Sequence, residues 1–520
     1  MRQHWDERAP ERARAILERM GERQRRAAAA RIATLIEVLA GGSSTGTAGS
    51  GGSDDPTTQI GRLEDLLAPA VPGHLWLARA VLTGRLPTSE QTESMARTAR
   101  LRGPWAALLS ALRVLERTDE PAPVRVAVGT VTCDIHDTSR TDFVSGIQRV
   151  VRAVSVRWAE REGVEFVGWT PDLRAMRPLS PVNHARIFGG EVVREDHAPP
   201  PEVVVPWAGT HLVPELAGDP NRITRIMALA SYAECRVGII GYDCIPLTTA
   251  SSVAPGMTGM FARYLASSRN VDRIAAISDA AATEYLGWRG MLAGVREEGP
   301  LVKGITLPVA GQTPNEESLA EARRRLGVTS VPMVLVVGSH EPRKNHLAVL
   351  HAAELLWREG LRFSLTLVGA ASWKAEAFYE AIGDLQGAGR PVQSIRGLPD
   401  DQLWAALQLA HCTLFPSLNE GFGLPVAESL AAGTPVITSD FGSTRDIVAP
   451  DGVPLGGILI DPRDDQAIVD ALRTMLADRE TYDRLQAEVS KHDLGSWDDY
   501  AAQVWDFLVE DGGRGVRHAR

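Results

Sequence analysis

Both fold and site depend on one stretch of this chain, Phe415-Pro416-Ser417-Leu418-Asn419-Glu420-Gly421-Phe422-Gly423-Leu424-Pro425-Val426-Ala427-Glu428. It follows the apolar run 412–415, which predicts a buried strand, and Pro425 suits the first turn of a helix. Between them, Gly421 and Gly423 permit backbone N–H groups to approach a ligand closely. A strand, a glycine turn and a helix in this order predict a ligand-binding loop of a parallel α/β sheet.

Two carboxylates stand on either side of the glycine turn. Glu420 precedes the predicted helix and Glu428 falls about one turn into it. A carboxylate can accept hydrogen bonds from two hydroxyls, which suits the diols of a sugar and of a ribose. A glutamate that merely favours a helix N-terminus would account for Glu428. It would not account for Glu420, the two glycines and Pro425 together.

A second motif, Val337-Gly338-Ser339-His340-Glu341-Pro342-Arg343-Lys344-Asn345-His346, also joins a predicted strand to a helix. Gly338 allows a tight exit from the strand. Arg343 and Lys344 then lie near a helix N-terminus, which already favours anions. Two cations at that place indicate a bound anion, and a solvated basic turn is the alternative.

Short apolar runs alternate with amphipathic stretches from residue 121 onward, which predicts βα units and parallel sheets. The expected strands are Val124–Val128, Val164–Trp169, Val203–Val205, Val237–Ile240 and Ile274–Ile277, then Met333–Val337, Ser364–Val368, Cys412–Phe415 and Pro435–Thr438. Gly360 is expected to end the helix that starts near His346. We expect two facing Rossmann-like domains, with a ligand site in the cleft between them.

The domain boundaries follow from changes in composition. Residues 1–120 are expected to form a helical accessory region, interrupted by a flexible Gly/Ser/Thr linker at 41–57. The N-terminal Rossmann-like domain is expected at 121–313 and the C-terminal one at 314–490. A last helix and tail, 491–520, are expected to cross back to the N-terminal domain.

Length, charge and cysteine content exclude some classes of function. The chain has 520 residues and a formal net charge of −10, which argues against general nucleic-acid binding. Its four cysteines lie in or near apolar stretches and form no C-x-x-C pair, so buried free thiols are expected. Neither a signal peptide nor an apolar run of membrane-spanning length is evident. These features favour a cytoplasmic protein and leave peripheral contact with the inner face of the cell membrane open.

The motifs together are recognisable. Glu420…Glu428, Glu-Pro-Arg-Lys-Asn at 341–345 and Ala-Gly-Thr-Pro-Val at 432–436 resemble the GT4 family of retaining glycosyltransferases, which have the GT-B fold. The resemblance implies that Arg343 and Lys344 bind the donor diphosphate, Glu420 the donor sugar and Glu428 the ribose. It also implies that backbone around the loop residues lies against the donor; these are Gly338, Gly421, Phe422, Gly423 and Leu424.

The N-terminal half resembles the family more loosely. Ser145-Gly146-Ile147-Gln148-Arg149-Val150 is similar to a bacterial subgroup of surface-polysaccharide enzymes, which implies that Gly146 approaches the donor phosphates. Gln148 and Arg149 could equally be helix surface. The segment 241–247 resembles a family segment that reads His-Asp-x-x-Pro, but here Tyr242 replaces the histidine. Tyr242, Asp243 and the loop residue His211 are candidates for the sugar or acceptor side.

The resemblance implies a function as well. We expect a metal-independent hexosyltransferase without a cofactor, with GDP-mannose as the favoured donor and a glycan or lipid-linked glycan as acceptor. Retention is expected through front-side attack, with the protein positioning the reactants and stabilising the leaving diphosphate. The alternatives are a nucleotide-sugar epimerase of the same fold and a non-catalytic protein that binds nucleotide sugar or glycan.

Overall fold

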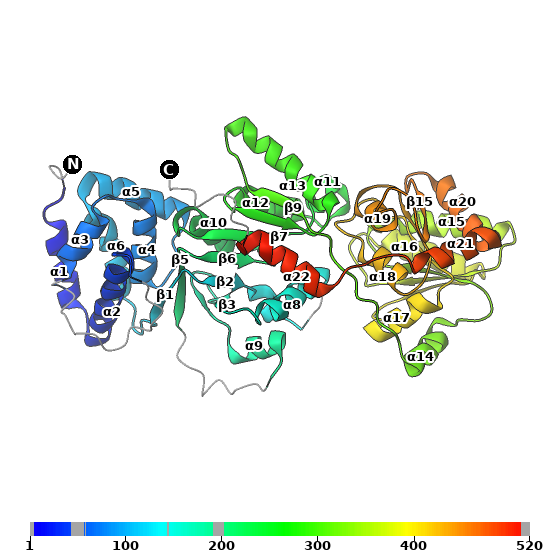
Figure 1. The fold of residues 1–520 in the computed structure, drawn as a ribbon, viewed down its shortest axis with the longest axis horizontal. Helices are drawn as coiled ribbons and strands as arrows, with labels where there is room; N and C mark the ends of the chain where they lie inside the picture. Colours follow the sequence, from blue (N-terminus) through cyan, green and yellow to red (C-terminus); the bar gives the residue numbers. More distant parts are fainter. Residues whose placement is uncertain (1–4, 43–56, 58, 143–144, 191–201, 511–520) are drawn as a thin grey trace.

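The computed structural model describes residues 5–42, 57, 59–142, 145–190 and 202–510. Three parts follow one another along the long axis of the molecule (Figure 1). A helical region lies at one end, an α/β domain lies in the middle, and a second α/β domain lies at the other end. Most of the linker expected at 41–57 and the tail 511–520 fall outside the described residues.

The helical region packs on the middle domain through α4. Trp76 of α4 is fully buried, and its ring stacks on Trp207 with centroids 6.5 Å apart. Gly73, also in α4, lies so close to the middle domain that a Cβ there would be 2.7 Å from the carbonyl oxygen of Tyr232. The described helices of this region are α1 Ala9–Arg19, α2 Glu22–Leu39, α3 Ile60–Leu67, α4 Pro72–Thr83, α5 Ser89–Arg102 and α6 Pro104–Glu116. The helical character expected for this region is therefore confirmed.

The middle domain is built on a sheet with nine strands in the described residues, in the order β1-β5-β4-β3-β2-β6-β7-β8-β9. Neighbouring strands are parallel except at β4, which pairs antiparallel with β3 and β5. The strands are β1 Val124–Val128, β2 Val131–Asp134, β3 Val164–Trp169, β4 Met176–Pro178, β5 Val203–Trp207, β6 Thr210–Val213, β7 Arg236–Gly241, β8 Arg273–Ala276 and β9 Leu301–Gly304. The helices are α7 His136–Ser139, α8 Gly146–Trp158, α9 Pro181–Phe188, α10 Pro220–Tyr232, α11 Ile245–Thr248, α12 Met257–Ser268 and α13 Asp279–Leu292, with 3₁₀ turns at Ala250–Ser252 and Ala293–Val295.

The last domain has a six-stranded parallel sheet within the described residues, in the order β12-β11-β10-β13-β14-β15. This order reverses between β10 and β13, the place where ligands bind to doubly wound sheets. The strands are β10 Met333–Val337, β11 Ser364–Val368, β12 Val392–Ile395, β13 Cys412–Phe415, β14 Val436–Ser439 and β15 Gly457–Ile460. The helices are α14 Glu316–Leu326, α15 His346–Arg358, α16 Glu376–Gly387, α17 Asp400–Leu409, α18 Leu424–Ala431, α19 Gly442–Val448, α20 Asp465–Ala477 and α21 Arg479–Val489, with a 3₁₀ turn at Pro342–Lys344.

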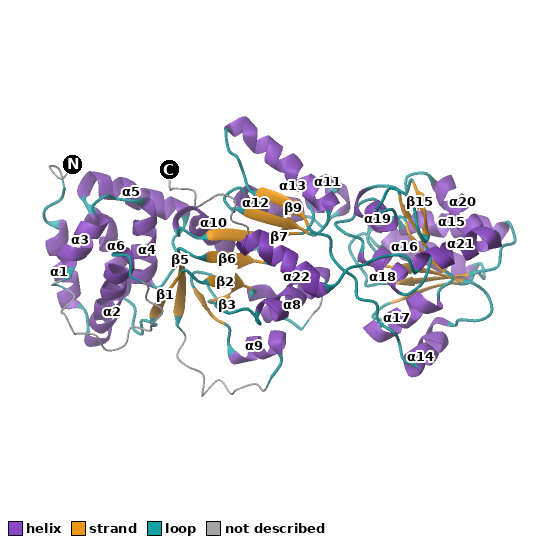
Figure 2. Ribbon diagram, viewed as in Figure 1, coloured by secondary structure: helices purple, strands orange, loops and turns teal. Residues whose placement is uncertain are grey.

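The last described residues cross back to the middle domain. Helix α22, Trp497–Trp505, continues into a π-helical turn, Asp506–Glu510. The indole of Trp158, at the end of α8, donates to the carbonyl of Ala501 at 3.0 Å, and Arg236 donates to the carbonyl of Val509 at 2.7 Å. Figure 2 shows α22 lying against α8 on the middle domain. The last helix therefore ties the two α/β domains together.

The expected strands are all present to within two residues, but the two sheets contain further strands. These are β2, β4, β6, β9, β12 and β15, each of three or four residues. Runs this short carry little periodicity, and β9 and β12 are sheet edges with half-exposed positions. The expected helix end is confirmed, since α15 stops at Arg358 and Gly360 follows with φ 94°. All four cysteines are free and buried, as expected.

Candidate active site

The first loop of the site leaves β10 at Gly338, whose φ of 149° is readily adopted by glycine. The 3₁₀ turn at Pro342–Lys344 follows, and Asn345 with φ 59° starts α15. A Cβ on Gly338 would lie 3.4 Å from Cε of Lys344, so the lysine stem runs across this glycine. Arg343 and Lys344 thus stand at the start of a helix, as the sequence predicts.

The second loop runs from β13 to α18. Gly423 has φ 94°, and a Cβ there would lie 2.8 Å from Cγ2 of Thr444. A Cβ on Gly421 would lie only 2.8 Å from Cβ of Asp243. A side chain at this position would therefore push the middle domain away. Pro425 occupies the first turn of α18, as expected. Both glycines are therefore required by close packing on either side of the loop.

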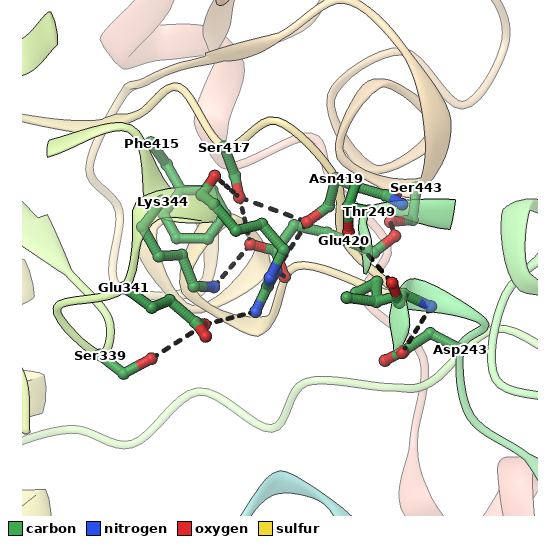
Figure 3. Close-up of polar contacts among 12 residues, drawn as sticks. Asp243, Thr249, Ser339, Glu341, Lys344, Phe415, Ser417, Asn419, Glu420 and Ser443 are labelled. Atoms are coloured by element: carbon green, nitrogen blue, oxygen red, sulfur yellow. Dashed lines mark hydrogen bonds and ion pairs between the residues drawn. The ribbon is translucent and has the colours of Figure 1, made fainter. Parts of the chain in front are cut away.

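The two loops meet in a buried ionic cluster (Figure 3). Nζ of Lys344 lies 2.5 Å from Oε1 of Glu420, and Nη1 of Arg343 lies 2.8 Å from Oε2 of the same carboxylate. Nη2 of Arg343 pairs with Glu341 at 2.6 Å, and the hydroxyl of Ser417 donates to Glu420 at 2.5 Å. The side chains of Arg343, Lys344 and Glu420 are 10 to 12% exposed. The cluster lies at the point where the strand order reverses.

Burial and charge act in opposite directions on these groups. Burial alone would raise the pKa of Glu420, but Lys344 and Arg343 outweigh it, and the pKa lies below its ordinary value. Burial lowers the pKa of Lys344, which Glu420 opposes. At neutral pH the carboxylate is therefore ionised and shared between two cations. A diphosphate with its own negative charge could take its place beside Arg343 and Lys344.

Glu428 lies on the other side of the glycine turn, one turn into α18, and is 6% exposed. Oε1 of Glu428 accepts a hydrogen bond at 2.8 Å from Nη1 of Arg149, a residue of α8 in the middle domain. Burial raises the pKa of Glu428, and Arg149 opposes this rise. Gly146, at the start of α8, faces Leu424, whose Cδ1 would be 3.6 Å from a Cβ on the glycine. Gly146 and Arg149 therefore both lie at the cleft between the domains.

Asp243 brings the middle domain onto the glycine loop. Its carboxylate packs against Gly421 and accepts from the backbone N–H of Ile245 at 3.2 Å. Burial raises its pKa to about 6, although Arg343 acts in the opposite direction. Ser278 caps α13 and also donates to the carbonyl of Gly421 at 2.6 Å. Asp243 thus reaches the site, and Ser278 holds the loop.

Two sequence-predicted candidates do not reach it. Tyr242 is buried, and its hydroxyl donates to the carbonyl of Pro214 at 2.7 Å, inside the middle domain. His211 is fully buried with Nδ1 2.8 Å from the hydroxyl of Thr132, and burial lowers its pKa to about 4. Both side chains are thus held inside the middle domain, and their assignment to the sugar or acceptor side stays a prediction. His211 belongs to strand β6, not to a loop as expected. A residue beside a strand end can face the domain interior as readily as the cleft.

A buried ionic network lies at the same edge of the middle sheet, and no motif in the sequence predicts it. Arg222 is 1% exposed and pairs with Asp134 at 2.8 Å, Glu215 at 2.6 Å and Asp137 at 2.7 Å. Glu215 also accepts from the backbone N–H groups of Asp137 and Thr138. The network therefore fixes the segment that follows β2. Its partners are up to 88 residues apart, so no local motif announces it.

Comparison with known proteins identifies the fold and a family match for the last domain. Residues 320–492 match the family described as glycosyl transferases group 1. The chain is 26% identical over 248 residues to the serotype-specific mannosyltransferase WbdA of Escherichia coli, which covers 46% of this chain and 29% of that protein. It is 32% identical over 209 residues to D-inositol 3-phosphate glycosyltransferase of Corynebacterium efficiens, which covers 39% of this chain and 49% of that protein. The chain thus spans less than half the length of these curated relatives.

The solved structure of Anabaena HepE in complex with UDP and glucose is similar in fold. The TM-score is 0.50 at 15% identity, over 73% of this chain and 99% of that one. The protein therefore has the GT-B fold, and residues 320–492 within it match the glycosyl transferases group 1 family. Arg343, Lys344, Glu420 and Glu428 all lie within the matched range. Within the described residues, no helix is long and apolar enough to cross a membrane.

Proposed function

We propose that this protein is a retaining glycosyltransferase that uses a nucleotide diphosphate sugar. The observation that carries the proposal is the ionic cluster of Arg343, Lys344 and Glu420, set at the strand-order reversal of a group 1 domain. Two cations held in a nearly dry cleft can stabilise the charge that develops on a departing diphosphate. That is the main chemical demand of glycosyl transfer from such a donor.

Each of the four charged groups binds a different part of the donor or a part next to it. Arg343 and Lys344 bind the diphosphate and release Glu420 from its ion pairs. Glu420 then turns to the hydroxyls of the donor sugar, because the glycine loop fixes it beside the phosphates. Glu428, across the loop, binds the ribose. Gly338 and the loop residues Gly421, Phe422, Gly423 and Leu424 line the donor, and Gly146 closes it from the middle domain.

The chemistry we propose is front-side attack by an acceptor hydroxyl, assisted by the leaving phosphate. The protein contributes position and electrostatic stabilisation, so it needs neither a cofactor nor a metal. Asp243, with a pKa of about 6, is the middle-domain carboxylate nearest the glycine loop and contacts the sugar or the acceptor.

Mannose is the sugar we favour, from GDP-mannose, because one relative is a mannosyltransferase by name. The acceptor we propose is a glycan or a lipid-linked glycan of bacterial surface polysaccharide. We place the reaction in the cytoplasm, with peripheral contact to the inner face of the cell membrane where the acceptor is lipid-linked. Each of these assignments is open to direct measurement.

The test is a panel of donors, GDP-mannose, UDP-glucose and UDP-N-acetylglucosamine, each incubated with the wild-type chain and with Glu420→Gln. Release of nucleoside diphosphate, followed by NMR of the new anomeric centre, is the measurement. We expect one donor to be consumed with retention and Glu420→Gln to be nearly inactive. Interconversion of the donor sugar without release of nucleotide would indicate an epimerase. Binding without any turnover across the panel would indicate a non-catalytic protein.

A further inference from the structure

Arg149 crosses the cleft between the two α/β domains. It lies one turn into α8 of the middle domain, and its Nη1 donates to Glu428 at 2.8 Å in the last domain. Its Nη2 lies 4.0 Å from Asp400, at the start of α17. The side chain of Arg149 is 39% exposed, whereas that of Glu428 is 7% exposed. The guanidinium therefore covers a carboxylate that has little other access to water.

The start of α8 is built to present this arginine. Ser145 and Gln148 form a capping box, in which Gln148 accepts from the backbone of Ser145 at 2.7 Å and Ser145 accepts from Gln148 at 3.4 Å. Gly146 has no side chain, so the helix can begin within contact distance of Leu424. Of the two residues that the motif left unassigned, Gln148 therefore fixes the helix start and Arg149 faces the cleft.

Other contacts across the cleft include that of Lys374, whose Nζ donates to the carbonyl of Ser251 at 3.1 Å. Two further bonds involve uncharged groups. Asn419 donates to the hydroxyl of Thr248 at 2.9 Å, and the indole of Trp373 donates to the carbonyl of Ser252 at 2.9 Å. These bonds join backbone and neutral side chains, and none of them occupies Glu420 or Glu428. The bond from Arg149 is different because it engages a group that the donor itself needs.

We propose that Arg149 is a gate on donor binding, which occupies Glu428 in the empty cleft and must be displaced by the ribose of the nucleotide. The inference rests on the proposed function, which puts the ribose on Glu428. A buried carboxylate without a partner is strongly destabilising. The arginine supplies a partner while the cleft is empty, and the ribose hydroxyls supply one when the donor arrives. Exchange of one for the other couples donor entry to release of a bond between the domains.

The gate has a measurable consequence for affinity. A ligand's apparent affinity falls in proportion to the fraction of protein in the competent state. If the gate is closed in roughly 70 to 90% of empty molecules, its removal tightens nucleotide binding about three- to tenfold. This range agrees with an ion pair that has one half-exposed partner and one buried partner.

Calorimetric titration with UDP and with GDP tests the gate directly. We expect Arg149→Gln to bind the preferred nucleotide about three- to tenfold more tightly than the wild type, and Arg149→Lys to fall between them. The matched control is Arg157→Gln, because Arg157 also lies on α8 and pairs with Asp498 at 2.5 Å, away from Glu428. This control should bind nucleotide like the wild type. The advantage of Arg149→Gln should shrink as NaCl rises from about 0.05 M to about 0.5 M, since salt weakens the partly exposed ion pair.

The result that overturns the gate is equal or weaker nucleotide binding by a folded Arg149→Gln. Weaker binding would make Arg149 a ligand of the nucleotide. The ribose assignment is tested separately by adding Glu428→Gln to Arg149→Gln, where no gate remains. If this double variant binds nucleotide as well as Arg149→Gln does, the ribose is not on Glu428 and that part of the proposed function fails. If it binds more weakly while Arg149→Gln shows no gain over the wild type, the gate alone is wrong.

Discussion

Lys344→Met removes one charge from the proposed donor site and keeps most of the side chain. The lysine has two roles in the structure. Its Nζ lies 2.5 Å from Glu420, and the same ammonium lies 4.6 Å from the centre of the Phe415 ring. Methionine keeps a stem that can cross Gly338 but removes the ammonium from both Glu420 and the Phe415 ring. The substitution therefore isolates the contribution of the charge.

The structure sets the size of the two expected effects. Glu420 keeps Arg343 at 2.8 Å and Ser417 at 2.5 Å, so no buried charge is left alone. We therefore expect a loss of about 1–2 kcal/mol in the free energy of unfolding, less than the roughly 3–5 kcal/mol seen when a buried pair is broken. Loss of one donor to a developing oxyanion lowers turnover by about 10²- to 10³-fold, or roughly 2.7–4 kcal/mol. Turnover should thus suffer more than stability.

The assay is release of nucleoside diphosphate from the donor that the panel identifies, with urea unfolding measured in parallel. Lys303→Met is the control, since Lys303 also lies over an aromatic ring, 5.9 Å from the centre of Phe507, but outside the cleft. Its turnover should match the wild type. A folded Lys344→Met with turnover within about threefold of the wild type would refute the diphosphate assignment, because that loss is far below the range for a charge-stabilising donor.

Three further predictions concern the rest of the site. Glu420→Gln should depress turnover and leave the affinity for free nucleoside diphosphate unchanged. Glu428→Gln, compared within the Arg149→Gln background, should weaken that affinity. Calorimetry that shows the reverse pattern would exchange the roles of the two glutamates. Folding raises the pKa of Asp243 from an ordinary 3.8 to about 6, so the stability it contributes is fully present below 3.8 and is lost as pH rises through 6. The free energy of unfolding of Asp243→Asn, relative to that of the wild type, should accordingly rise by roughly 1 kcal/mol from about pH 5 to about pH 7 and change little above pH 7. Urea unfolding measures this difference, and a difference that does not vary with pH would contradict the prediction. Turnover should survive EDTA because two cations and helix N-termini neutralise the leaving group, and a strict requirement for added Mg²⁺ or Mn²⁺ would count against that.

Much of the geometry of the proposed donor site could be predicted from local sequence. The turns and the helix start of the two loops depend on residues within the loops themselves, which are Gly338, Gly421, Gly423 and Pro425. Such backbone conformations are set largely by the local sequence. Glu341 was the omission. It stands inside the quoted motif, two residues before Arg343, and pairs with it at 2.6 Å. A buried arginine with two carboxylate partners could have been suspected, but exposure of that loop cannot be inferred from its own residues.

The middle domain was harder to interpret. Gly146 and Asp243 lie at the cleft, whereas Tyr242 and His211 point into the domain. Adjacent residues at the end of a strand point to opposite sides of the sheet, so Tyr242 and Asp243 diverge. A shift of one residue in register decides which of the two faces the cleft, and register depends on neighbouring strands.

The sequence by itself therefore determined the fold class and the chemical character of the donor loops. Those features depend on periodicity, turn residues and helix starts, which act over short distances along the chain. Only the tertiary structure decided which groups face one another. Arg149 and Glu428 are 279 residues apart, and they meet because the packing of the two α/β domains brings the start of α8 to α18. Pairing of residues across a domain cleft depends on how the two domains pack, and no single stretch of sequence predicts that packing.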